Sequence, residues 1–114
     1  MKMREVVELL DLEILTSTRE FLDIDVSAGY TSDMLSCVMT GAENGSLWVT
    51  LMANLNIVAV ATLLEIPAII ITENARPEQA TLERANNQGV ALLSTPRGSF
   101  EVVGRLWERG LGKG

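Results

Sequence analysis

From Ser46 onward, the sequence alternates short apolar runs with stretches of helical pattern three times in succession. The apolar runs occupy residues 46–52, 68–72 and 90–94, and the helical stretches occupy residues 56–65, 77–88 and a last segment that begins at Ser99. Strands that alternate with helices in this way are joined by right-handed crossovers and form a parallel sheet with helices packed on its faces. The second half of the chain therefore predicts an α/β fold.

Two further strands are expected before this repeat. Residues 12–16 have a strand-like pattern, and residues 23–30 alternate apolar and polar side chains, which is typical of a half-buried strand that is antiparallel or lies at an edge. A short helix is expected over residues 3–10. We therefore predict a single α/β domain whose mixed, mostly parallel sheet has about five strands, with helices on both faces. Its boundaries are expected at 1–11 for the N-terminal helix, 12–109 for the α/β domain and 110–114 for a tail that frays.

Local signals predict where several helices begin and end. Ser32 and Ser99 are expected to cap two helices at their N-termini, and Gly41 and Gly89 to end two helices. The stretch 56–65 is apolar nearly all round and should be deeply buried. The last helix carries one apolar stripe, made of Phe100, Val103, Leu106 and Trp107.

The composition excludes several classes of function. The chain contains no histidine, which excludes His-based triads and His metal ligands. Its one cysteine, Cys37, has no basic neighbour in the sequence to activate it, so we expect a small core residue. Fifteen Asp and Glu against nine Lys and Arg give a formal net charge of −6, which argues against a nucleic-acid partner. No apolar run reaches the ~20 residues of a membrane span, so we expect a cytoplasmic protein without a membrane partner.

Polar residues follow the expected strands, at the edge where open α/β sheets bind ligands. They are Thr50, Asn54, Asn56, Thr72, Asn74, Ser94 and Thr95. Their hydroxyl and amide groups could hold a small polar ligand; alternatively, they cap helices and satisfy the backbone of loops. We expect Asn56 to be an N-cap and leave Asn54 open to either role. No residue is assigned to catalysis, to a metal or to a cofactor.

Three segments resemble the DRTGG domain family. The run 46–72, SLWVTLMANLNIVAVATLLEIPAIIIT, looks like this family. Residues 26–36 resemble its usual lead-in, a strand followed by an Asp-Leu-Leu-like helix start, and residues 90–95 followed by Ser99-Phe100-Glu101 fit its close. The resemblance covers about residues 12–106. The letters that name the family do not occur as a contiguous motif, so no site residue is carried over.

The resemblance implies an α/β domain that usually accompanies other domains. Such domains are found in phosphotransacetylases, in CBS-containing pyrophosphatases and, in a similar form, at the amino terminus of HPr kinase, whose P-loop domain has no counterpart in this sequence. Their role there is regulatory or assembly-related. Stand-alone members occur in anaerobic bacteria and archaea, some linked by genome context to iron-only hydrogenases, which implies a protein partner in anaerobic metabolism.

Three functions remain open from the sequence. We expect a non-catalytic regulatory or assembly module that forms a homodimer. The candidate faces are the Trp107 helix and the Tyr30 strand, although we expect Trp107 itself to be a core residue rather than part of an interface. A second hypothesis is a sensor of an adenine nucleotide or another small anion at the carboxyl ends of the strands. A third is a carboxylate-dependent enzyme, with or without Mg²⁺, although nothing in the spacing of its residues requires it. Its candidate residues are Asp23, Asp25, Asp33 and Glu73.

Overall fold

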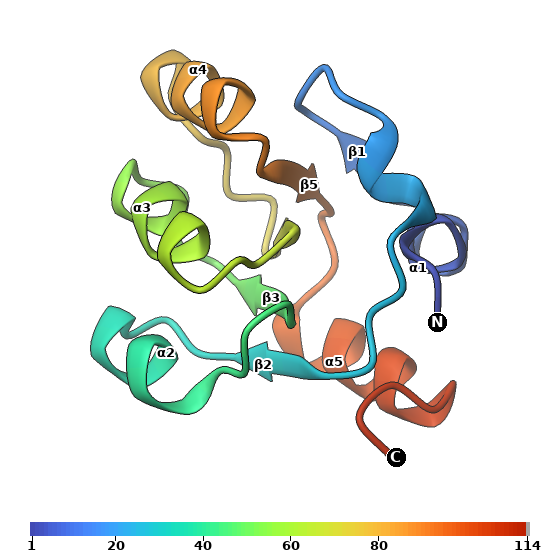
Figure 1. Cartoon of the computed structure of the whole chain (residues 1–114). Coiled ribbons are helices and arrows are strands. Elements are labelled where there is room, and N and C mark those ends of the chain that lie inside the picture. Colours follow the sequence, from blue (N-terminus) through green and yellow to red (C-terminus); the bar gives the residue numbers. More distant parts are fainter. Residues whose placement is uncertain (114) are drawn as a thin grey trace.

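The fold is a five-stranded sheet in the order β1-β5-β4-β3-β2, with helices on both faces (Figure 1). The structure is a computed structural model that describes residues 1–113. Strand β1 pairs antiparallel with β5, and the other neighbours are parallel. The elements are α1 (Met3–Leu10), β1 (Glu13–Ile14), the 3₁₀ helix η1 (Glu20–Asp23), β2 (Gly29–Thr31), α2 (Leu35–Gly41), β3 (Leu47–Thr50), α3 (Asn56–Leu63), β4 (Ala68–Ile71), α4 (Gln79–Gln88), β5 (Ala91–Ser94) and α5 (Ser99–Glu108).

The three central strands are buried on both faces, which confirms the predicted α/β class. Every residue of β3, β4 and β5 is buried, because α1 and α5 cover one face of the sheet and α2, α3 and α4 cover the other (Figure 1). Alternate residues of each strand enter two separate apolar clusters, so that Ile70 packs toward α1 and α5 while Ile69 packs toward the opposite helices. Strands covered on both faces are expected to be continuous apolar runs, as these are. None of the helices in residues 1–113 is long and apolar enough to cross a membrane.

The segment 23–30 differs from the single strand that its alternating pattern predicts. Only Gly29–Thr31 joins the sheet, as the edge strand β2, and it runs parallel to β3. The preceding residues pair with the N-terminus instead: the N–H of Met3 donates to the carbonyl of Ile24, and the N–H of Val26 donates to the carbonyl of Met1. The alternating segment is therefore extended as predicted, but most of it pairs with residues 1–3 and not with a strand of the sheet.

Four helices, α1, α3, α4 and α5, end in the same way. The residue after each helix or after its cap takes the left-handed conformation, and the N–H of the next residue then donates to the carbonyl five positions earlier, as in a Schellman motif. The left-handed residues are Asp11, Glu65, Gly89 and Gly110, and the residues that follow them are Leu12, Ile66, Val90 and Leu111. The four residues that follow are all buried, so an apolar side chain packs into the core directly after each helix end. The predicted stop at Gly89 is confirmed.

The last of these motifs changes the expected picture of the C-terminus. Residues 110–113, for which we expected fraying, fold back against the domain; Gly114 lies outside the described residues. Leu111 is 6% exposed and belongs to the same cluster as α1 and α5. The N–H of Gly112 donates to the carbonyl of Ser27 at 3.1 Å, which ties the tail to the segment before β2.

The predicted N-terminal caps are wrong in each case. α2 starts at Leu35, and Ser32 Oγ accepts a hydrogen bond from the N–H of Met34 in a turn ahead of that helix. Asn56 is the first residue of α3, and its own N–H donates to Asn54 Oδ1 at 3.0 Å. Ser99 is the first residue of α5, and its N–H donates to the carboxylate of Glu73 at 2.9 Å. The three polar residues lie close to the helix starts, but none of them accepts a hydrogen bond as the N-cap of its helix.

Three burial predictions also need correction. Cys37, expected in the core, is exposed on α2. Helix α3 buries Ile57, Val58, Val60 and Ala61, yet Leu63 is 65% exposed. The apolar stripe expected on α5 is divided: Leu106 and the neighbouring Val102 face the core, whereas Phe100 is 96% and Trp107 is 55% exposed. Helix α5 therefore presents an apolar surface on its outer side.

Gly41, expected to end a helix with a left-handed turn, instead makes room for an aromatic ring. It is the last residue of α2, and Ala42 follows as an ordinary extended cap. A Cβ at position 41 would overlap the ring of Tyr30, whose hydroxyl donates to the carbonyl of Cys37 at 3.1 Å. The glycine is thus required by packing rather than by backbone conformation.

Gly41→Ala should therefore destabilise the protein by about 1–3 kcal/mol, the range for overpacking a filled site. Gly104→Ala is a matched control, because a Cβ at that helical glycine meets no atom within 4 Å and the better helix propensity of alanine should stabilise by up to about 1 kcal/mol. Chemical denaturation at low protein concentration measures both. Equal effects from the two substitutions would contradict the packing of Tyr30 against α2.

Candidate functional site

The predicted polar residues gather at the carboxyl ends of the parallel strands. The N–H of Thr72 donates to the carbonyl of Thr50, and the N–H of Asn74 donates to the carbonyl of Thr95, so the segments that follow β3, β4 and β5 are bonded side by side. Ser94 is the last residue of β5. Asn54 and Asn56 lie at the start of α3, in the loop that leaves the same edge. The topology therefore brings the predicted set to one edge of the sheet.

The hydroxyl groups of this set already have partners within the chain. Thr50 Oγ1 donates to Asp33 Oδ1 at 2.8 Å, and Thr72 Oγ1 lies 2.6 Å from Ser99 Oγ. Thr95 Oγ1 accepts the N–H of Arg97. Ser94 Oγ accepts a hydrogen bond from Arg76 Nη1 and donates one to Glu13 Oε1. These threonines and this serine are all buried. Their observed bonds hold the loops at this edge in place, as caps and turns do.

The asparagine side chains remain exposed at this edge. Asn54, Asn56 and Asn74 are all exposed, although Asn54 Oδ1 already accepts the N–H of Asn56. Asn74 has a φ of 59°, which places its backbone in the left-handed region where asparagine is tolerated better than most residues. Amide groups on this rim are the polar groups of the predicted set that a ligand could reach.

Glu73 occupies the position that an anion would take at this edge. Its carboxylate accepts the N–H of Ser99 at the start of α5, where backbone donors and the helix dipole favour negative charge. Its φ of 61° is unusual for a residue with a side chain, and the bond from its N–H to the carbonyl of Arg97 fixes that conformation. No sequence pattern predicts this contact, because Glu73 and Ser99 are far apart along the chain.

The remaining carboxylates considered for chemistry lie in different places. Asp23 pairs with Arg4, whereas Asp25 pairs with Lys2 and the N-terminal amine, all on the side of α1. Asp33 accepts hydrogen bonds at the end of β3, from Thr50 and from the N–H of Leu51. Within residues 1–113 no three Asp, Glu or Cys side chains come together as a metal site would need.

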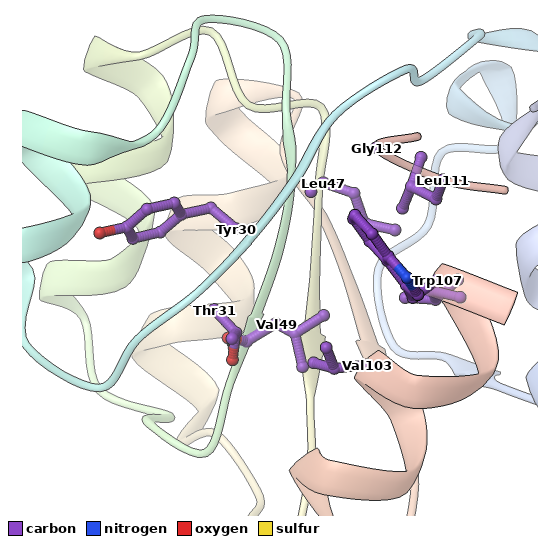
Figure 2. Close-up of a pocket in the computed structure, with 10 residues that line it drawn as sticks. Tyr30, Thr31, Leu47, Val49, Val103, Trp107, Leu111 and Gly112 are labelled. Atoms are coloured by element: carbon purple, nitrogen blue, oxygen red, sulfur yellow. The ribbon is translucent and has the colours of Figure 1, made fainter. Parts of the chain in front are cut away.

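A half-open apolar pocket lies between β2 and α5, away from the predicted residues. Its volume is about 100 Å³. Figure 2 shows Leu47 and Val49 of β3, Val103 and Trp107 of α5 and Leu111 around it, while the Tyr30 ring points away toward α2. Gly29 and Thr31, the β2 residues that face α5, complete the wall beside β2. Small side chains on β2 opposite a tryptophan create the space, and only the tertiary structure reveals that they face each other.

A shallower groove of about 360 Å³ continues the pocket along α5. It is lined by Thr31, Ser99, Phe100, Val103, Gly104 and Trp107. Beside it runs β2, an edge strand with a free side in the sheet order. Exposed edges and apolar grooves of this kind are features that proteins normally cover or use for binding.

A sequence model of the DRTGG domain matches residues 5–108, nearly the whole chain. The chain belongs to the DRTGG domain family. The match begins within α1, and α1 shares one apolar cluster with α5, so the N-terminal helix is packed as part of this domain. No curated protein matches the chain.

A solved DRTGG structure has the same fold. It is the crystal structure of the CBS and DRTGG domains of the regulatory region of Clostridium perfringens pyrophosphatase, complexed with the activator diadenosine tetraphosphate. The two superpose with a TM-score of 0.73 at 15% sequence identity. The superposition covers 94% of this chain but only 45% of the pyrophosphatase region, so this chain spans less than half of that regulatory region.

Proposed function

We propose that the chain is a non-catalytic regulatory module that forms a homodimer and acts on a partner protein by assembly. The observation that carries this proposal is the apolar groove beside the free edge of β2, with the exposed Phe100 at its margin. Membership of the DRTGG family supports a regulatory role. Surfaces of this composition bind other proteins and offer few groups for chemistry.

A carboxylate-dependent enzyme has less support. The four acidic residues that the sequence suggested are distributed over separate parts of the fold and hold different partners. General acid–base chemistry needs such groups within hydrogen-bond reach of one substrate. Only Asp33 and Glu73 lie at the carboxyl edge, where they fix a loop and the start of α5.

Sedimentation velocity tests the homodimer directly. Over a concentration range of about 1–100 µM, the sedimentation coefficient should rise with concentration toward that of a dimer. A constant monomer value over this range would contradict the homodimer, whichever surface it was supposed to use.

The second candidate function is a sensor of an adenine nucleotide or another small anion at the carboxyl edge. It is favoured by one observation: the related regulatory region was crystallised with diadenosine tetraphosphate. For this site we propose two sets of residues: the exposed asparagines Asn54, Asn56 and Asn74 contact the ligand. The buried strand-end hydroxyl groups of Thr50, Thr72, Ser94 and Thr95 hold the loops that carry them. The carboxylate of Glu73 opposes an anion there, because it already fills the start of α5.

Glu73→Gln should distinguish the structural role of the carboxyl edge from its proposed role in binding a nucleotide. Without ligand it should lower the free energy of unfolding by about 1 kcal/mol, because a charged group at a helix N-terminus is lost. If the edge binds nucleotides, the melting temperature should rise with AMP, ATP or diadenosine tetraphosphate, and the rise should be larger in Glu73→Gln than in the natural protein. A ligand at 100 times its Kd adds about 2.7 kcal/mol.

The matched control is Glu83→Gln, which removes the same charge from an exposed position in α4. It should leave both the unliganded stability and any nucleotide effect unchanged. No shift of the melting temperature with any of the three nucleotides, in either protein, would exclude the sensor. An equal shift in the natural protein, Glu73→Gln and Asn54→Ala would show binding elsewhere.

A further inference from the structure

The outer side of α5 carries an apolar stripe whose two aromatic side chains are more than half exposed. Phe100, Val103, Gly104 and Trp107 follow the spacing i, i+3, i+4, i+7, which places them on one side of a helix. We call these four residues the α5 stripe. Phe100 is 96% and Trp107 is 55% exposed, and all four residues line the groove beside β2. Such spacing is typical of a helix that packs against another helix.

Gly104 lies at the centre of this stripe without a reason inside the chain. Glycine weakens the interior of a helix. A Cβ at position 104 would meet no atom within 4 Å, and its φ is not among the positive values that favour glycine. Gly41 shows the contrast, because Tyr30 occupies the space that its side chain would fill. A glycine in the middle of an exposed apolar stripe lets a second helix approach closely.

The charges around the stripe favour a second copy of this chain. The chain has a net charge of −6, so two copies repel each other wherever acidic surfaces meet. The α5 stripe contains no charged residue, and the neighbouring Glu101 is paired with both Arg97 and Arg105, at 2.9 Å and 3.6 Å. The ammonium of Lys113 lies 5.5 Å from the centre of the Trp107 ring, at one end of the stripe. The centre of the stripe, Val103 and Gly104, can therefore meet its own copy without bringing like charges together.

The stripe is also complementary to itself. Its midpoint lies at Val103 and Gly104, with one aromatic residue a turn away on either side. If two α5 helices cross antiparallel at Gly104, Phe100 of each copy meets Trp107 of the other. The apolar pocket of about 100 Å³ beside Trp107 gives the incoming phenyl ring a place to insert. Each copy thus supplies both the inserting side chain, Phe100, and the pocket beside Trp107 that receives it, as a twofold contact requires.

We propose that two copies of this chain associate through an antiparallel α5–α5 contact that crosses at Gly104, with Phe100 of each copy packed beside Trp107 of the other. The inference rests on the homodimer proposed above and names its surface. Phe100 and Trp107 together expose on the order of 300 Å² of aromatic surface. A standard interface buries about 800 Å² per partner, and the groove and the adjoining free edge of β2 extend the apolar face.

Disulfide trapping tests the register of this contact. In a Cys37→Ser background, which removes the exposed native thiol, Gly104→Cys should form a disulfide-linked dimer under mild oxidation, because the two Gly104 residues face each other at the crossing. Phe100→Cys in the same background should not, since its two copies are separated by about 12 Å along the helix axes at 1.5 Å per residue. That separation exceeds the Cα distance of about 4.4–6.8 Å that a disulfide allows.

Sedimentation of charge variants tests the contact without a cross-link. Phe100→Glu should raise the dimer Kd at least about tenfold, as loss of a central aromatic contact typically does, and Phe100→Lys should do the same although its charge has the opposite sign. Leu63→Glu is the matched control, because Leu63 is 65% exposed on α3, on the other side of the sheet, and the change in charge is identical. Its dimer Kd should change little, and none of these exposed positions should affect folding.

The outcomes distinguish this inference from the proposed function. A dimer that is unaffected by Phe100→Glu and Phe100→Lys, or that is trapped by Phe100→Cys and not by Gly104→Cys, overturns the α5 contact while leaving the homodimer in place. A natural protein that is monomeric at every concentration overturns both. The α5 contact is supported if a disulfide-linked dimer forms with Gly104→Cys but not with Phe100→Cys, and if Phe100→Glu and Phe100→Lys both raise the dimer Kd.

Discussion

Trp48→Ala is expected to lower the free energy of unfolding by about 3–5 kcal/mol, the range for truncating a large buried aromatic residue. Trp48 lies in β3, is fully buried, and packs in the cluster that joins the sheet to α2, α3 and α4. Its indole N–H also donates to the carbonyl of Ser32 at 3.1 Å, which ties the end of β2 to β3. Because domains of this size have a total stability of about 5–15 kcal/mol, the variant should be close to unfolding at 37 °C.

Urea denaturation followed by circular dichroism measures this loss, and two variants separate its causes. Trp48→Phe keeps most of the apolar contact and removes the indole donor, so it should cost less than Trp48→Ala, with about 1 kcal/mol from the lost hydrogen bond. Trp107→Ala makes the same truncation at a tryptophan that is 55% exposed. Measured where the protein is monomeric, it should cost less than half as much as Trp48→Ala. Equal losses at the two tryptophans would contradict the assigned burial.

The parallel core could be predicted from the sequence because burial on both faces leaves a direct signature. Runs such as Ala68–Ile71 and Ala91–Ser94 are short, apolar and β-branched or aliphatic, and the helices between them fix the crossover direction. The prediction of one strand over residues 23–30 was wrong because alternation shows only that one side of an extended segment is buried. It does not show the partner strand, which here includes the N-terminus through the bridge between Lys2 and Asp25.

The ends of the helices, too, could be predicted only in part from the local sequence. Gly89 could be predicted because glycine adopts the left-handed conformation at little cost. Asp11 and Glu65 adopt it too, with φ values of 50° and 56°. Aspartate is enriched among the residues that adopt this conformation but glutamate is not, so residue type does not mark both of these helix ends. A readable signal did exist at the C-terminus: Gly110 follows α5 and the apolar Leu111 comes next, which is the Schellman pattern. An apolar residue directly after a helix-ending glycine thus predicts a docked tail.

The location of the polar edge followed from topology alone, since the carboxyl ends of parallel strands must meet there. Thr50, Thr72 and Thr95 do come together, but their partners, such as Asp33 and Ser99, lie on other elements and depend on the tertiary structure. The apolar pocket could not be predicted from the sequence for the same reason, because it depends on the tertiary structure. It requires Gly29 and Thr31 to lie opposite Trp107, across a gap of more than 70 residues in the chain.

Leu111→Ala is expected to destabilise the protein by about 2–5 kcal/mol, which is the range for truncating a buried leucine. The side chain of Leu111 packs with α1 and α5, and its Cδ2 lies 3.2 Å from where a Cβ of residue 29 would stand. Its N–H donates to the carbonyl of Leu106, and the two leucines line the same pocket. Truncation should therefore enlarge the pocket and release the end of α5 together, and urea denaturation measures the cost.

Leu63→Ala provides the comparison, because it removes the same atoms from a leucine that is 65% exposed, and it should change stability by no more than about 0.5 kcal/mol. If both substitutions cost equally little, the tail is frayed, as its position at the end of the given sequence predicts. The pocket beside Trp107 would then lack one wall and could not receive a phenyl ring. A large loss for Leu111→Ala alone would mean that the last residues of the chain shape the surface on which the α5 contact depends.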